Sequence, residues 1–121
     1  MKNILILGAG LSASTLIRYL LEKGIEHNWT VTLADRDIEL AQRKVKGHAN
    51  GKAVPFDLKD AKLLSDLVQS ADLVVSMMPA MFHPVVARQC LAHSKHLFTA
   101  SYVSPEMRSL SVEAESKNLL F

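Results

Sequence analysis

Short apolar runs alternate with amphipathic stretches along the whole of this 121-residue chain. The first run, Ile4 to Leu7, is unbroken and ends at a glycine, which is typical of a strand buried on both faces of a sheet. This alternation predicts an α/β fold in which helices cover both faces of a parallel sheet, because parallel neighbours require crossover connections. The expected strands span 3–7, 30–34, 53–56, 72–78 and 96–100, and the expected helices 11–23, 38–45, 60–69, 84–92 and 105–117.

Several residues mark the expected boundaries. Gly24 is expected to close the first helix, Asp60 to cap the start of the third, and Pro84 to stand in the first turn of the fourth. The last residues, 119–121, resemble the opening of a sixth strand that is cut short. We therefore expect residues 1–121 to form one domain of a longer protein.

Composition excludes several classes of protein. Apolar residues make up 49% and charged residues 21%, so the chain can bury a core and is not expected to be disordered. The formal net charge is only +2 and the basic residues are scattered, so no nucleic-acid partner is expected. The first apolar run is too short to span a membrane and lacks the flanks of a secretory signal. Cys90, the single cysteine, cannot form an internal disulfide, which favours a cytoplasmic location.

A glycine-rich turn follows the first predicted strand directly. Residues 8–13 read Gly-Ala-Gly-Leu-Ser-Ala, a match to the G-x-G-x-x-A pattern. Gly8 permits the tight turn, Gly10 leaves room for a pyrophosphate to approach the backbone, and Ala13 lets the helix pack closely on the strand. The free N–H groups at the helix start attract the diphosphate. A purely structural turn also fits the motif, but a strand before it and a helix after it favour dinucleotide binding.

An acidic residue, Asp35, ends the second predicted strand, at about the 20-residue spacing expected for the ribose contact. Its carboxylate suits the ribose hydroxyls of NAD and repels the 2′-phosphate of NADP. Arg36 can meet that phosphate, stack on adenine, or simply be a solvated surface residue. We therefore expect a Rossmann-type doubly wound domain with three αβα layers that binds NAD or NADP, with a slight preference for NAD.

Ligands in such folds lie at the carboxyl ends of the strands, where the strand order switches. Asp57 and Leu58 follow the third predicted strand and can contact adenine, although a turn role suits Asp57 equally well. Met78 and Pro79 follow the fourth strand, near the expected nicotinamide ribose, and Met81 is expected in the core. The five histidines show no metal-ligand spacing, so no metal is expected. No catalytic acid, base or nucleophile can be identified.

Two stretches of the second half carry a family resemblance. Pro-x-x-x-His-Pro-Val-Val-Ala over 79–87 and Ala-Ser-Tyr-Val-Ser-Pro over 100–105 resemble the saccharopine dehydrogenase family, in particular its glutamate-forming reductases. The resemblance extends over essentially the whole chain. It implies an oxidoreductase of lysine metabolism that transfers a hydride between NAD(P) and a secondary amine (CH–NH) joining two amino-acid skeletons.

The resemblance also implies which residues form the site. Ser101 and Tyr102 would lie at the substrate edge, although Tyr102 also suits a packing role. The candidate cofactor-binding residues are Gly8, Ala9, Gly10, Leu11, Ser12, Asp35, Arg36, Asp57, Leu58, Met78, Pro79, Thr99 and Ala100.

One departure from the family bears on activity. The family continues into a long substrate-binding domain that these 121 residues do not contain, so this fragment alone is expected to be inactive. An amino-acid-derived substrate would be bound through that domain, and the full-length enzyme is a possible homodimer. The alternatives are a regulatory NAD-sensing domain without catalysis and an S-adenosylmethionine-dependent methyltransferase. The 101–105 turn disfavours the first, and the tight glycine turn at the start of the chain disfavours the second.

Overall fold

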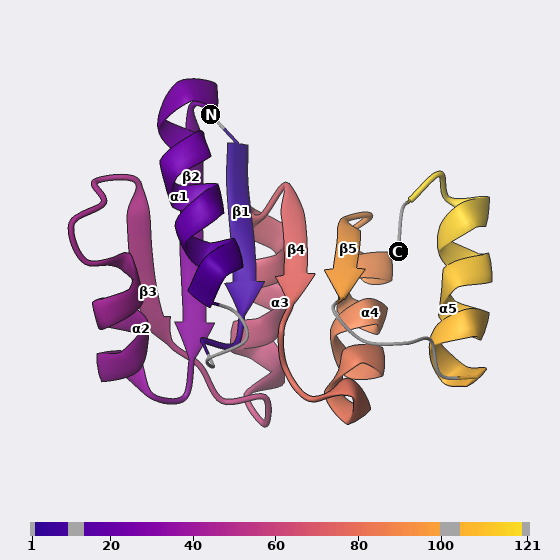
Figure 1. Cartoon of the computed structure of the whole chain (residues 1–121). Helices are drawn as coiled ribbons and strands as arrows, with labels where there is room; N and C mark the ends of the chain where they lie inside the picture. Colours follow the sequence, from indigo (N-terminus) through magenta and orange to yellow (C-terminus); the bar gives the residue numbers. More distant parts are fainter. Residues whose placement is uncertain (1, 10–13, 100–104, 120–121) are drawn as a thin grey trace.

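The structure is a computed structural model that describes residues 2–9, 14–99 and 105–119. Its strands form one five-stranded parallel sheet in the order β3-β2-β1-β4-β5 (Figure 1). The strands are β1 (Lys2–Leu7), β2 (Trp29–Asp35), β3 (Gly51–Pro55), β4 (Leu73–Ser76) and β5 (His96–Thr99). The helices are α1 (Ser14–His27), α2 (Ile38–Val45), α3 (Ala61–Ser70), α4 (His83–Ala92) and α5 (Pro105–Ser116), and a short 3₁₀ turn, η2 (Ala80–Phe82), precedes α4.

Two apolar clusters, one on each face of the sheet, make up the core. Ile4 and Ile6 of β1 pack with residues of α1 and α2, whereas Leu5 and Leu7 pack with residues of α3, α4 and α5. In Figure 1, α1 lies in front of the sheet and α3 and α4 lie behind it. The unbroken apolar run of β1 is explained by these two clusters, because alternate side chains enter opposite faces. The predicted doubly wound α/β fold with three layers is confirmed.

The predicted starts of two helices are confirmed in detail. Asp60 caps α3, its Oδ1 accepting a hydrogen bond from the N–H of Leu63 at 3.0 Å. Asp37 caps α2 in the same way through the N–H of Leu40, at 3.1 Å. These bonds satisfy N–H groups that have no partner within the helix.

Gly24 does not close the first helix as the sequence predicts. It is buried inside α1, which continues to His27 and gives way to Asn28 at a left-handed φ of 60°. A Cβ on Gly24 would lie 2.6 Å from Nδ2 of Asn50 and 3.0 Å from the carbonyl oxygen of Trp29. The glycine is therefore needed for close packing of α1 against the strand β2 and not for a helix end.

The fourth strand is shorter than predicted, since β4 ends at Ser76, although the N–H of Met77 still donates to the carbonyl oxygen of Leu7 of β1 at 2.8 Å. The expected sixth strand is not seen at Leu119, and residues 120 and 121 lie outside the described part of the chain. Among the described residues, no helix is both long and apolar enough to span a membrane.

Candidate functional site

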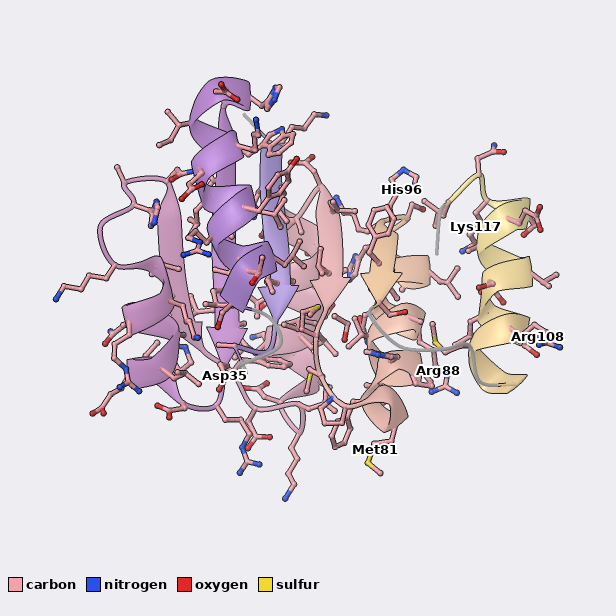
Figure 2. All side chains as sticks on the ribbon, in the orientation of Figure 1. Asp35, Met81, Arg88, His96, Arg108 and Lys117 are labelled. Carbon is pink, nitrogen blue, oxygen red and sulfur yellow. The ribbon has the colours of Figure 1, made fainter. Side chains whose placement is uncertain are left out.

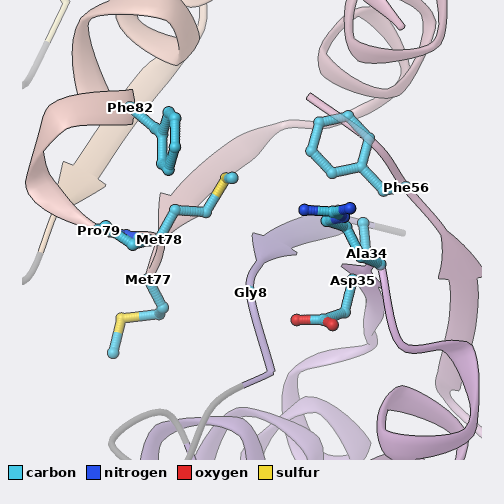
Figure 3. A pocket seen from close by; sticks show the side chains of 9 residues that line it. Gly8, Ala34, Asp35, Phe56, Met77, Met78, Pro79 and Phe82 are labelled. Carbon is cyan, nitrogen blue, oxygen red and sulfur yellow. The ribbon is translucent and has the colours of Figure 1, made fainter. Parts of the chain in front are cut away.

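A pocket of about 350 Å³ opens where the strand order reverses, at the carboxyl ends of β1, β2 and β4 (Figure 3). It is the position at which doubly wound sheets bind their ligands. Nine residues line it: Gly8, Ala34, Asp35, Arg36, Phe56, Met77, Met78, Pro79 and Phe82. Five of the predicted site residues are among them, namely Gly8, Asp35, Arg36, Met78 and Pro79.

Gly8 brings the end of β1 against the end of β4. Its φ is +101°, and a Cβ at this position would lie 3.2 Å from the carbonyl carbon and oxygen of Met77. Its N–H donates to the carbonyl oxygen of Ala34 at 2.8 Å. Both the backbone conformation and the lack of space require glycine here.

The carboxylate of Asp35 ties two backbone segments together. Its Oδ2 accepts a hydrogen bond from the N–H of Ala9 at 2.7 Å, and its Oδ1 accepts one from the N–H of Asp37 at 2.8 Å. Figure 3 shows the carboxylate directed toward the side of the pocket on which Gly8 lies. Asp35 thus connects the residue after Gly8 to the start of α2. We call Gly8, Asp35 and Arg36 the polar side of the pocket.

Arg36 is the cationic residue of the pocket lining, and its side chain is exposed. Within the described residues it makes no hydrogen bond or ion pair. Since its guanidinium has no partner in the described residues, it is available to bind an anionic group of a ligand.

The opposite, apolar side of the pocket is the 77–82 loop, which joins β4 to α4. Met77, Met78, Pro79 and Phe82 of this loop line the pocket. Figure 3 shows Phe82 and Met78 across the pocket from Phe56, which follows β3. The apolar surfaces of this loop and of Phe56 suit flat rings of a ligand. Met81, expected in the core, is 75% exposed and points away from the body of the protein (Figure 2).

A serine and a histidine are hydrogen-bonded behind the 77–82 loop. Oγ of Ser76 and Nδ1 of His83 are 2.9 Å apart, and both residues are buried. Burial lowers the pKa of His83 below its usual value of 6.5, because the interior disfavours the charged imidazolium. Sequence analysis assigned His83 no role, although the residue lies in one of the two family-like stretches.

The remaining predicted residues lie elsewhere or outside the described residues. Asp57 is exposed and forms a turn, its Oδ1 accepting from the N–H of Lys59 at 2.9 Å, and it does not line the pocket. Leu58 packs against the core cluster of α3 and α4, and Thr99, half-buried, ends β5 opposite Ser76. Gly10, Leu11, Ser12, Ala100, Ser101 and Tyr102 lie outside the described part of the chain.

Other candidate sites have weaker support. A hollow of about 460 Å³ lies on α2 and its C-cap, lined by Glu39, Gln42, Arg43 and Lys46, and no strand end contributes to it. In the residues that the structure describes, no group of three or more His, Cys, Asp or Glu is placed to hold a metal ion. Burial raises the pKa of Cys90 to about 12, which keeps its thiol protonated and unreactive.

Comparison with known proteins gives a consistent result. Residues 4–121 match the family model described as "Saccharopine dehydrogenase NADP binding domain". The chain is 35% identical to the NADP(+), L-glutamate-forming saccharopine dehydrogenase of Schizosaccharomyces pombe, covering 94% of this chain and 25% of that protein. It is 33% identical to the mitochondrial alpha-aminoadipic semialdehyde synthase of Mus musculus, covering 98% of this chain and 12% of that protein.

A solved structure agrees with these matches. The apo saccharopine dehydrogenase (L-Glu forming) of Saccharomyces cerevisiae superposes with a TM-score of 0.82 at 33% identity, over 93% of this chain and 24% of that one. The chain therefore spans about a quarter of the length of this relative and of the S. pombe protein.

Proposed function

Because the chain belongs to the saccharopine dehydrogenase family, we propose that it is the NADP(H)-binding part of an oxidoreductase of lysine metabolism that acts on a secondary amine. The observation that carries the proposal is the pocket at the strand-order switch, with a glycine-dependent turn and Asp35 on one side and an apolar loop on the other. The substrate we propose is saccharopine, which the names of the relatives imply.

Each part of the pocket has a proposed task. The adenosine half of the cofactor would lie between Arg36 and Phe56, and its pyrophosphate would lie against the glycine turn, including Gly10. The nicotinamide half would lie along the 77–82 loop, with Thr99 beside it. When bound, the nicotinamide supplies the hydride chemistry, while these residues bind and orient it and exclude water. The other proposed contacts are Ala9, Leu11, Ser12, Asp57, Leu58 and Ala100 to cofactor, and Ser101 and Tyr102 to substrate.

The preference between the two cofactors is proposed to favour NADP. The slight preference for NAD that the sequence predicts has no support in the comparisons, and the matched family and relatives are named for NADP. Asp35 is held by two backbone N–H groups, which offset part of the negative charge that would repel a 2′-phosphate. Arg36 lines the pocket with no partner in the described residues, so its guanidinium is available for that phosphate.

The contacts proposed above do not account for the whole protein. We propose that residues 1–121 form the cofactor-binding domain and that another domain binds the amino-acid-derived substrate and supplies the catalytic acid and base. No finding favours the regulatory alternative. A homodimer of the full-length enzyme and a cytoplasmic location stay predictions; the matched Mus musculus relative is named as mitochondrial.

Calorimetric titration of the chain with NADPH and NADH tests the proposal. We expect both to bind and NADPH to bind about tenfold more tightly, a difference of about 1.4 kcal/mol. Arg36→Ala is expected to remove that preference. The control is Arg43→Ala, which replaces an exposed arginine of α2 and is expected to leave the preference unchanged. A parent chain that binds neither cofactor overturns the proposed function, and equal or tighter NADH binding overturns only the cofactor preference.

An assay with saccharopine tests the division of tasks. Residues 1–121 are expected to bind NADP(H) but to show no saccharopine-dependent change in cofactor absorbance. Turnover at the rate of an intact enzyme would place the catalytic groups within these residues.

A further inference from the structure

The Ser76–His83 pair closes the base of the 77–82 loop. Ser76 is the last residue of β4 and His83 is the first residue of α4, so the pair joins the two ends of the loop. The exposed fractions of the two residues are 0% and 2%, which shields their hydrogen bond from competing water. The side chains that form the apolar side of the pocket all lie between these two residues.

We propose that His83 is a positioning residue for the dinucleotide site. Its hydrogen bond to Ser76 fixes the path of the 77–82 loop and thereby the surface on which the nicotinamide half of NADP(H) lies. This inference rests on the proposed function and extends it to a residue that does not line the pocket.

At the start of α4, the loop lacks the side-chain hydrogen bond that usually caps a helix. Phe82 occupies the N-cap position of α4 and makes no side-chain hydrogen bond to the helix. Within the loop, the N–H of Phe82 donates to the carbonyl oxygen of Pro79 at 2.9 Å, a contact that shapes the turn but does not tie it to the sheet. The N–H of Met77 donates to the carbonyl oxygen of Leu7 at 2.8 Å, which holds the start of the loop to β1. The bond between Ser76 and His83 ties the end of the loop to the sheet, because Ser76 is in β4 and His83 is the first residue of α4.

The absence of charge on the pair suits its place behind the surface on which the nicotinamide ring is proposed to lie. Because burial lowers the pKa of His83, the imidazole is neutral at physiological pH and forms its bond to the serine hydroxyl as an uncharged group. A neutral histidine places no positive charge beside the cationic ring of NADP⁺, whereas a lysine or arginine at the same position would repel it.

The molecule contains a second pair of the same chemistry that serves as a control. Oγ of Ser65 and Nε2 of His93 are 2.8 Å apart, joining α3 to the C-cap of α4, and neither residue lines the pocket. Removing this pair should affect packing of the two helices without affecting the 77–82 loop.

The test measures the affinity for NADPH and for adenosine 2′,5′-bisphosphate, a probe that carries only the adenosine half. Ser76→Ala and His83→Gln are expected to weaken NADPH binding about tenfold, on the order of the cost of one buried unpaired polar group, and to leave binding of the bisphosphate unchanged. His83→Asn is expected to keep the NADPH affinity of the parent. The asparagine amide occupies the place of Nδ1, whereas the glutamine amide occupies that of Nε2. Ser65→Ala is expected to bind both probes like the parent.

A second measurement follows the loop itself. Spectra of ¹³C-methyl-labelled methionine should show the Met77 and Met78 signals shifting in Ser76→Ala and His83→Gln, while the signal of Met107, a buried residue of α5, stays in place. This measurement reports on the loop of the folded chain without any ligand. If Ser76→Ala does not fold, the comparison of His83→Asn with His83→Gln carries the test.

The outcomes separate the inference from the proposed function. Unchanged NADPH affinity in both Ser76→Ala and His83→Gln, with a parent chain that binds NADPH, overturns the positioning role alone. Equal losses for NADPH and the bisphosphate mean a general structural role and also overturn it. A parent chain that binds neither probe overturns the proposed function and this inference with it.

Discussion

The two sides of the pocket are built on different principles. On the polar side, Gly8 and Asp35 shape the site through backbone conformation and hydrogen bonds to backbone N–H groups. On the apolar side, the 77–82 loop presents side chains whose position depends on a buried pair behind them, Ser76 and His83. The first arrangement depends on residue types at fixed spacing. The second depends on a contact between residues that themselves lie outside the pocket.

Replacing Gly8 should disrupt both sides at once and have the largest effect. In Gly8→Val, a branched side chain meets the backbone of Met77 at a φ that favours glycine. NADPH binding is expected to fall below detection, and the free energy of unfolding to decrease by about 3 kcal/mol from strain and overpacking. Calorimetry and urea denaturation measure the two effects.

Gly47→Val is the matched control for that substitution. Gly47 also has a positive φ, +86°, but no atom lies within 4 Å of its Cβ position. It is expected to lose about 1–2 kcal/mol of stability from the backbone conformation alone and to keep NADPH binding. Similar losses of binding in the two variants would show that instability, and not the junction of β1 with β4, is responsible.

Replacing Asp35 tests whether the polar side acts through its hydrogen bonds or through its charge. Asp35→Ser removes the acceptors for the N–H groups of Ala9 and Asp37. Affinity for NADPH and NADH is expected to fall together by about 2 kcal/mol, roughly 30-fold, because the glycine turn loses its partner.

Asp60→Ser is the control for Asp35→Ser, because the Asp60 carboxylate likewise accepts a backbone N–H, that of Leu63, but lies outside the pocket. It should leave both affinities unchanged. If Asp35→Ser instead weakens NADH and strengthens NADPH, charge repulsion is the dominant role of Asp35.

The same contrast explains how much could be predicted from the sequence. Gly8 and Asp35 could be identified because their chemistry demands particular residue types at a known spacing. Phe56 and Phe82 could not, because an apolar residue after a strand looks the same whether it fills the core or lines a pocket. Gly24 was misread as a helix end because its role depends on Asn50, a contact far away in the sequence. Asp57 fits both an adenine contact and a turn; the structure shows the turn hydrogen bond, and the adenine contact stays a prediction.

The smallest expected effect concerns pH and the apolar side. Burial lowers the pKa of His83 in the folded chain, whereas in the unfolded chain it stays near 6.5. Below pH 6.5 the unfolded chain therefore binds a proton at His83 that the folded chain does not, and the free energy of unfolding decreases as the pH falls toward the folded-state pKa. One such group contributes at most about 1.4 kcal/mol per pH unit.

In His83→Asn this contribution is absent, so between pH 7 and pH 5 the parent should lose more stability than the variant. Urea denaturation of the two proteins at several pH values measures the difference, in which contributions from the carboxylates cancel. Parallel curves would mean that the imidazole accepts its proton as readily in the fold as in water, and the Ser76–His83 bond would then not be the neutral buried contact that holds the 77–82 loop.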